Sequence, residues 1–262
     1  MPLECVVNIS EGRQAPVIAE IGAAAGDDLL DTHTDPHHNR TVLTLRGETA
    51  PQAVARAAVS LLDLRSHQGA HPRIGVVDVV PFVPLGTDLL EDAITARDGF
   101  AGWIAEELGV PAFLYGPDRS LPDVRRGAFT SLVPDVGPGR PHPTAGAVAV
   151  GARPVLVAWN IYLRAPDLTL ARKVAAAVRG PHLRALGLPV GDEVQVSMNL
   201  IGPEALGPAE AWDLVAAHAA PDRAELVGLV PQAVLDRTPT QRWSQLDLSP
   251  DRTIESRWGE GL

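Results

Sequence analysis

The order of apolar segments in the first 85 residues limits the possible folds more than any other feature of the chain. Short, strand-like apolar runs occupy residues 3–8, 28–33, 41–47 and 74–84. Residues 15–24 and 50–65 instead carry apolar side chains three and four positions apart, which is typical of helices. The resulting order, β-α-β-β-α-β, predicts a ferredoxin-like unit.

The second half of the chain repeats this order less regularly. Strands are predicted at 153–163, 184–190, 193–201 and 224–230, and helices at 167–179 and 208–219. We therefore predict an α+β fold of two ferredoxin-like βαββαβ subdomains with facing antiparallel sheets. We expect the N-terminal subdomain to span residues 1–146 and the C-terminal subdomain residues 147–262.

An additional segment lies between the two halves and is assigned to the first subdomain. Residues 87–109 have helical spacing, and residues 111–116 resemble a strand. Residues 117–146 are rich in proline and glycine, and we expect no regular elements there. An irregular stretch of this length within a compact domain is either disordered or a binding loop.

Composition excludes several classes of function. The 22 basic and 32 acidic residues give a formal charge of -10, and no basic stripe with interleaved aromatic residues suggests a nucleic-acid partner. No run approaches the roughly 18 apolar residues of a membrane span. The chain has one cysteine and no signal-like start, so we expect a cytoplasmic protein.

The segment Arg65–Gly75, RSHQGAHPRIG, concentrates residues that could carry chemistry. His67 and His71 have the i, i+4 spacing of a zinc pair, and His33, His37 and His38 could add ligands. Gly69 and Pro72 interrupt any helix between the pair, so no metal is expected. His71, held extended by the following proline, is a candidate general base; the alternative is a histidine that only caps the turn.

Other polar residues at strand ends are candidates for substrate binding. Arg73 could hold a substrate carboxylate in bidentate fashion. Asn8 lies near the end of one predicted strand, and Asn39 and Arg40 lie at the start of another. Asn160 interrupts an apolar strand, so its amide either bonds a neighbouring loop or faces a ligand.

Several segments together resemble the formiminotransferase family, which includes the N-terminal part of formiminotransferase-cyclodeaminases. The matching stretches run in family order over most of the chain, and H-x-G-x-H-P-R-x-G is the most specific. They are ECVVNISEGR (4–13), HHNRTVLTLRG (37–47), SHQGAHPRIGVVDVVPFVP (66–84), AEELGVPAFLYG (105–116), VGARPVLVAWNIYL (150–163), QVSMNL (195–200) and LVGLVP (226–231).

This resemblance implies two ferredoxin-like subdomains, a homodimer, and transfer of a formimino group between N-formimino-L-glutamate and tetrahydrofolate in histidine degradation. The family's catalytic histidine falls on His71. Tetrahydrofolate would be a co-substrate, with no metal. The folate-contacting loop falls on Gly137, Pro138, Gly139, Arg140, Pro141, His142, Pro143, Thr144, Ala145 and Gly146.

The chain also departs from the family pattern. Arg140, Pro141, His142 and Ala145 stand where the family loop carries aromatic or other apolar residues, and His33 stands where the vertebrate enzyme has an aspartate. Two alternatives therefore remain open. One is a relative that binds a folate-like ligand without turnover, and the other is a formyl or formimino transferase with another amino acceptor. On chemical grounds, Arg40, Arg73 and Arg140 are candidates for binding the substrate carboxylates.

Overall fold

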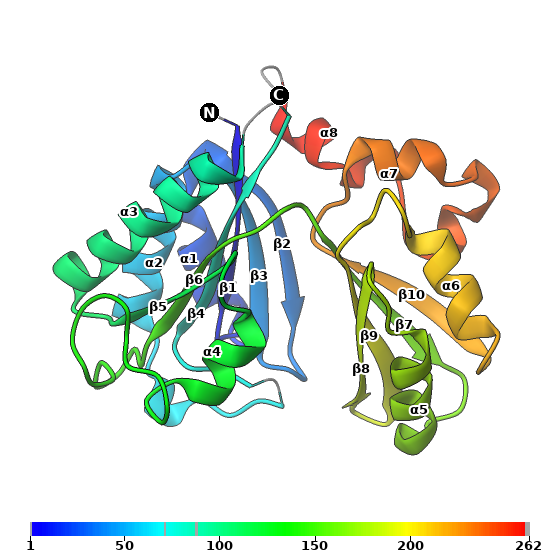
Figure 1. The fold of residues 1–262 in the computed structure, drawn as a ribbon, viewed down its shortest axis with the longest axis horizontal. Helices are drawn as coiled ribbons and strands as arrows, with labels where there is room; N and C mark the ends of the chain where they lie inside the picture. The colour runs from blue at the N-terminus through cyan, green and yellow to red at the C-terminus, as the bar shows by residue number, and fades with distance from the viewer. Residues whose placement is uncertain (1, 71, 87–88, 260–262) are drawn as a thin grey trace. The chain divides into compact units, whose positions relative to one another are not determined.

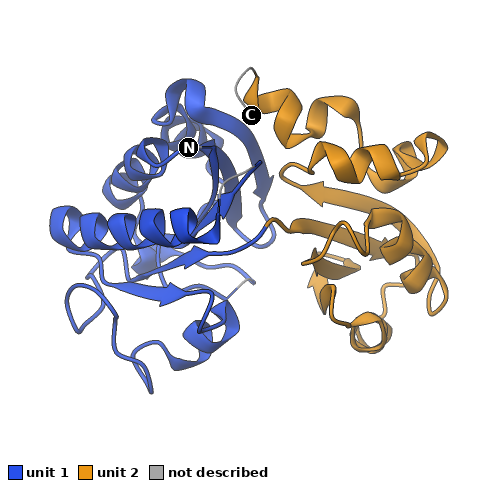
Figure 2. Cartoon of the chain, turned by 45° about the horizontal axis from the view of Figure 1, so that its top comes forward, with its two compact units in different colours: residues 1–154, 261–262 blue, residues 155–260 orange. Residues whose placement is uncertain are grey.

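The computed structural model describes residues 2–70, 72–86 and 89–259. This part of the chain forms two compact units, one that reaches to Pro154 and one that begins at Val155 (Figure 2). Each unit has its own sheet and its own hydrophobic core.

The first unit begins with the predicted β-α-β-β-α-β order (Figure 1). Its elements are β1 (Leu3–Ile9), α1 (Ala15–Ala23), β2 (Leu29–Asp35), β3 (Arg40–Arg46), α2 (Thr49–Leu61) and β4 (Val77–Pro84). The four strands lie in the order β2-β3-β1-β4, and each neighbouring pair is antiparallel. This arrangement confirms the prediction of a ferredoxin-like unit.

Two further strands make the first sheet mixed rather than antiparallel throughout. α3 (Leu90–Leu108) leads to β5 (Ala112–Tyr115), and α4 (Leu121–Gly127) precedes β6 (Val148–Ala152). β6 lies between β4 and β5 and is parallel to both, because connections that contain helices return the chain in the same direction. The predicted strand 153–163 is wrong at its start, because β7 begins at Val157. β6, at residues 148–152, was not predicted.

The proline- and glycine-rich segment covers one side of these added strands. α1, α2 and α3 bury one face of the first sheet with side chains such as Leu43, Phe82 and Ile104. The opposite face near β5 and β6 forms a second, smaller core that includes Phe113 and Val124. The prediction that residues 117–146 lack regular elements is therefore wrong, because α4 lies within this segment and closes that core.

A capping box explains why a short helix forms in this proline-rich context. The Ser120 hydroxyl accepts a hydrogen bond from the Asp123 amide at 3.3 Å, and the Asp123 carboxylate accepts one from the Ser120 amide at 3.3 Å. These contacts satisfy backbone donors that the first turn of a helix leaves unpaired. Pro122 lies in that first turn, where its missing N–H costs little.

The second unit repeats the β-α-β-β-α-β order. Its elements are β7 (Val157–Leu163), α5 (Leu168–Val178), β8 (Leu183–Val190), β9 (Glu193–Leu200), α6 (Pro208–Ala216), β10 (Pro221–Val227), α7 (Gln232–Arg237) and α8 (Ile254–Trp258). The strand order is β10-β7-β9-β8, antiparallel throughout, and α5 and α6 cover one face over Trp159. None of the helices described here is long and apolar enough to cross a membrane.

Candidate active site

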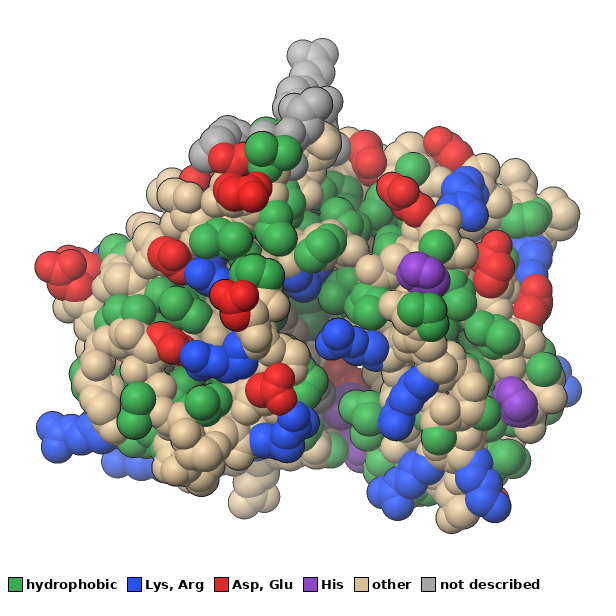
Figure 3. Space-filling view, in the orientation of Figure 1, with side chains coloured by type: hydrophobic (Ala, Val, Ile, Leu, Met, Phe, Trp, Pro, Cys, Tyr) green, Lys and Arg blue, Asp and Glu red, His purple; other side chains and the backbone are tan. Residues whose placement is uncertain are grey.

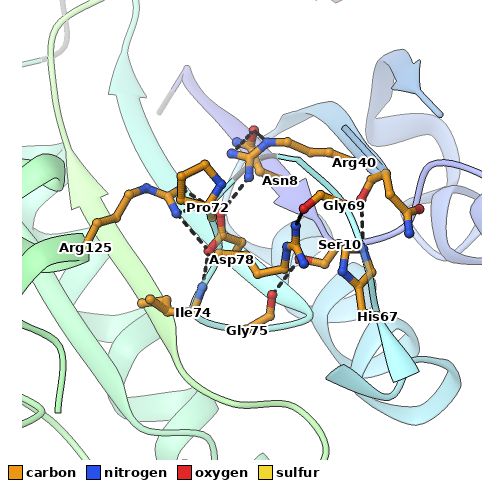
Figure 4. Close-up of polar contacts among 12 residues, drawn as sticks. Asn8, Ser10, Arg40, His67, Gly69, Pro72, Ile74, Gly75, Asp78 and Arg125 are labelled. Carbon is orange, nitrogen blue, oxygen red and sulfur yellow. Dashed lines mark hydrogen bonds and ion pairs between the residues drawn. The ribbon is translucent and has the colours of Figure 1, made fainter. Parts of the chain in front are cut away.

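A buried carboxylate lies at the centre of the polar residues of the first unit. Asp78, in β4, is 0% exposed. Its Oδ2 accepts hydrogen bonds from Arg40 Nη1 at 2.6 Å and from Arg125 Nη2 at 2.7 Å, and its Oδ1 accepts one from the Ile74 amide at 2.8 Å (Figure 4). Asp78 therefore joins β3, α4 and the loop that precedes β4.

The ion pairs at Asp78 are charged. Burial alone would raise the pKa of Asp78, but Arg40 and Arg125 lie against the carboxylate, and the net effect is a lowered pKa. Burial lowers the pKa of Arg40, and the negative charge of Asp78 opposes that shift. Because arginine stays protonated in proteins, the two guanidinium groups leave a net positive charge beside one carboxylate.

Two more predicted residues belong to this group. Asn8, in β1, accepts hydrogen bonds through Oδ1 from Arg40 Nε at 3.1 Å and Arg40 Nη2 at 2.8 Å. Arg73 donates to the Gly69 carbonyl, and its charge interacts with those of Asp78 and Arg40. We call Asp78, Arg40, Arg73 and Arg125 the Asp78 cluster; it combines three positive charges with one negative charge.

The positive charge of this cluster contrasts with the rest of the chain. The sequence contains 22 basic and 32 acidic residues. On the surface visible in Figure 3, acidic and basic side chains are interspersed over much of the first unit, whereas basic side chains gather on the lower part of the second. The Asp78 cluster is therefore a local concentration of arginines in an acidic protein, which is the arrangement needed to bind an anion.

Asn39 connects this region to the histidine-containing segment. Its backbone is left-handed, with φ of 50°, a conformation that asparagine tolerates better than most residues. Its Oδ1 accepts from the Gly12 amide at 2.8 Å, and its Nδ2 donates to the Gln68 carbonyl at 2.9 Å. The Asn39 carbonyl lies 2.9 Å from His67 Nε2, which therefore carries the proton of the ring.

His67 keeps one buried ring nitrogen as an acceptor. Since Nε2 donates to Asn39, Nδ1 carries the lone pair, and it has no hydrogen-bond partner among the residues that the structure describes. Burial lowers the pKa of His67, and the neighbouring Arg73 charge acts in the same direction. These effects favour a neutral imidazole.

The predicted folate loop, residues 137–146, divides into two parts. Its first residues, 137–141, are exposed, and they include Arg140, which lies outside the hydrogen bonds of the Asp78 cluster. Its last residues form a turn in which the His142 amide donates to the Gly146 carbonyl at 2.7 Å. Gly146 pairs with Gly75 in an isolated β-bridge, so the end of the loop is attached to the segment that follows Arg73.

Gly75 allows this close approach, and we expect its replacement by alanine to destabilise the fold. A Cβ at Gly75 would lie 2.0 Å from the Ala147 carbonyl oxygen. Overpacking of this kind should lower the free energy of unfolding of Gly75→Ala by about 1–3 kcal/mol, measured by urea denaturation. In the exposed part of the 137–146 loop, a Cβ at Gly139 would meet nothing within 4 Å. Gly139→Ala is therefore the control. Equal stability of the two variants would contradict this packing.

Two further predicted site residues, His71 and Asn160, also lie outside the Asp78 cluster as defined here. His71, the predicted general base, lies outside the described residues. Asn160 lies in β7 of the second unit, where its Nδ2 donates to Glu225 Oε2 at 2.9 Å, and the Tyr162 hydroxyl lies 3.3 Å from the same oxygen. The Asn160 amide nitrogen therefore bonds a side chain of the neighbouring strand β10, not a loop.

Of the histidines considered as metal ligands, His37 and His38 lie in the turn between β2 and β3, and His33 lies in β2. Asp35 Oδ1 accepts from the amides of His37 at 2.7 Å and His38 at 2.8 Å, and Asp35 Oδ2 lies 2.5 Å from His38 Nδ1. This turn leads directly into Asn39 and Arg40. Within the described ranges, no three His, Cys, Asp or Glu side chains are grouped so as to hold a metal ion.

The Asp35 turn should make stability depend on pH. Burial opposes ionisation of Asp35, but hydrogen bonds from His38 and His37 lower its pKa from 3.8 to about 2. Because the pKa of Asp35 is lower in the folded state than in the unfolded state, the ionised carboxylate stabilises the fold above about pH 4. This stabilisation is lost as the pH falls toward 2. After allowance for solvent screening, we expect Asp35→Asn to be about 1 kcal/mol less stable than the parent at pH 6, with the difference vanishing near pH 2.

Urea denaturation at a series of pH values measures this effect. Asp27→Asn, an exposed change in the same unit, is the control and should follow the parent at every pH. A pH-independent difference between Asp35→Asn and the parent would show that the Asp35 carboxylate is not responsible.

Sequence reasoning missed two members of the Asp78 cluster. Asp78 is the one charged residue in the apolar run IGVVDVVPFVP (74–84), and a carboxylate in a buried strand requires partners, so a signal was present. Arg125 carried no such signal, because it lies in the segment for which no elements were predicted.

The fold and site define a protein of two βαββαβ units, the first of which carries a buried arginine–aspartate cluster beside a His- and Gly-containing loop. A family model described as the formiminotransferase domain, N-terminal subdomain, matches residues 2–153. The chain is 36% identical over 235 residues to a glutamate formimidoyltransferase of Streptococcus pyogenes serotype M1, covering 77% of this chain and 78% of the relative.

Other relatives agree with this match. The chain is 35% identical over 273 residues to a glutamate formimidoyltransferase of Thermoplasma acidophilum, covering 89% of this chain and 90% of the relative. It is 34% identical over 279 residues to a formimidoyltransferase-cyclodeaminase of Gallus gallus, covering 89% of this chain and 51% of that longer protein. The chain belongs to the formiminotransferase family of transferases.

Proposed function

We propose that this chain transfers a formimino group between N-formimino-L-glutamate and tetrahydrofolate, a step of histidine degradation. The observation that supports this most is the Asp78 cluster, which places an excess of positive charge beside the H-x-G-x-H-P-R-x-G segment, residues 67–75. The names of the relatives, glutamate formimidoyltransferase and formimidoyltransferase-cyclodeaminase, support the reaction.

The proposed substrates suit this charge, because N-formimino-L-glutamate carries two carboxylates and folate carries those of its own glutamate. Arg40 and Arg73 are proposed to bind a carboxylate, with Arg40 oriented by Asn8 and Asp78. Asn39 and Asn160 are proposed as further substrate-binding residues. Residues 137–146, including Arg140, are proposed to contact folate.

The proposed chemistry is an amine exchange at the formimino carbon. The attacking amine nitrogen forms a new C–N bond while the C=N electron pair moves to the imino nitrogen, giving a tetrahedral adduct. His71 is proposed to take the proton from the attacking nitrogen and return one to the leaving nitrogen. The old C–N bond then breaks and the C=N bond forms again.

An assay with purified protein tests this function. Tetrahydrofolate-dependent consumption of N-formimino-L-glutamate, with formation of 5-formiminotetrahydrofolate, is the expected result. Consumption of a formyl donor instead, or transfer to a different amino acid, would replace the proposed substrate while keeping the reaction class. Thermal stabilisation by tetrahydrofolate without turnover would identify a binding protein and contradict the proposal.

The proposal also includes the assembly that the family resemblance implies. A homodimer is proposed. The expected subdomain boundary after residue 146 moves to Pro154, because β6 belongs to the first sheet. Sedimentation equilibrium of the purified chain would decide between a monomer and a dimer.

A further inference from the structure

The loop directly after His71 is held at two backbone positions by Arg125 and Asp78. Arg125 Nη1 donates to the Pro72 carbonyl at 2.5 Å, while Nη2 of the same guanidinium donates to Asp78 Oδ2 at 2.7 Å. The other carboxylate oxygen, Oδ1, accepts from the Ile74 amide at 2.8 Å (Figure 4). The two held backbone groups lie on either side of Arg73.

Both side chains are fixed by buried structure. Asp78 is fully buried in β4, and the Arg125 side chain is 17% exposed. Val124, the residue before Arg125, is 0% exposed in the small core beneath α4. Because α4 is packed against this core, the direction of the Arg125 guanidinium is set by packing rather than by the loop that it contacts.

The guanidinium is suited to this double contact. Its planar, fixed donors reach a carboxylate and a carbonyl at the same time, which a lysine ammonium on a flexible chain does less well. Pro72 has no N–H, so its carbonyl is the backbone group through which it can be held. Arg125 and Asp78 together therefore restrict the backbone of residues 72–74.

We propose that Arg125 is a positioning residue for the transfer reaction. With Asp78, it fixes the backbone of Pro72–Ile74 and thereby sets where Arg73 meets the substrate. This inference rests on the proposed function. A displacement of about 1 Å in such groups can cost about 100-fold in rate, so an arginine that contacts no reacting atom can still control kcat.

Arg125→Gln and Arg125→Lys test this proposal, with Arg126→Gln as the matched control. Arg126 is the next residue on α4, but its side chain is exposed and pairs with Asp123. We expect Arg125→Gln to lower kcat by about 10- to 100-fold and to accelerate hydrogen exchange at the Ile74 amide. Arg125→Lys, which keeps a positive charge beside Asp78, should fold like the parent and show an intermediate kcat. Arg126→Gln should change neither quantity.

The two readouts separate this proposal from the proposed function. Unchanged Ile74 exchange in Arg125→Gln, or an unchanged kcat in a folded Arg125 variant, would overturn the positioning role. If Arg125→Gln does not fold, the kcat and Ile74 exchange of Arg125→Lys decide in the same way. If the parent chain transfers no formimino group, the catalytic role fails with the proposed function, and faster Ile74 exchange would still establish that Arg125 holds the loop.

Discussion

Asp78→Asn is expected to lower the free energy of unfolding by about 3–5 kcal/mol, the effect typical of breaking a buried ion pair on one side. The substitution keeps the size of the side chain but removes its charge. Arg40 and Arg125 would then remain with guanidinium groups that have lost their shared counter-charge, one of them 14% and the other 17% exposed. Equilibrium urea denaturation measures the change.

A surface aspartate provides the control for Asp78→Asn. Asp63 also pairs with an arginine, with 2.5 Å between Asp63 Oδ2 and Arg65 Nη2, but the Arg65 side chain is 69% exposed. Exposed pairs of this kind contribute little, so Asp63→Asn should leave the denaturation midpoint unchanged. If Asp78→Asn were as stable as Asp63→Asn, the charge of Asp78 would not be needed to hold the two arginines.

The expected cost is high because Asp78 holds parts of the chain that are distant in sequence. Arg40 follows the β2–β3 turn, Arg125 lies on α4, and Ile74 belongs to the loop before β4. A partly buried cation without its partner must be desolvated without compensation. Loss of the carboxylate therefore affects the loop, the helix and the strand together.

Periodicity was sufficient to predict the β-α-β-β-α-β order in both units, because each strand and helix buries one face with a regular apolar pattern. It failed at β6, Val148–Ala152, a strand of small residues that is separated from β7 by only a few positions. A short run buried on both faces has no alternation to reveal its limits. β6 was therefore not predicted as a strand, and only the strand that follows it was.

The site was predictable only where a local signal existed. Asn8, Arg40 and Arg73 were selected from their positions at strand ends and from a family motif, and the structure brings these three together. Arg125 could not be selected, because its role depends on where α4 packs, and the composition of residues 117–146 concealed that helix. Contacts between distant segments are the part of a site that sequence patterns leave undetermined.

His71→Asn is expected to lower kcat for formimino transfer by about 10²–10⁴-fold, the usual contribution of a general acid–base group. Asparagine can form hydrogen bonds, but it cannot accept a proton near neutral pH as an imidazole does. Steady-state rates of the parent and of His71→Asn measure the effect.

The position of His71 between two structured segments makes the result specific to its chemistry. Asn39 and His67 hold the chain before it, and Asp78 and Arg125 hold the chain after it, so the substitution should leave the melting temperature close to that of the parent. His218→Asn, an exposed change in the second unit, controls for loss of a histidine as such and should keep the parent rate. A folded His71→Asn variant with the parent kcat would remove His71 from the mechanism and direct attention to His67, whose Nδ1 is buried with its lone pair available.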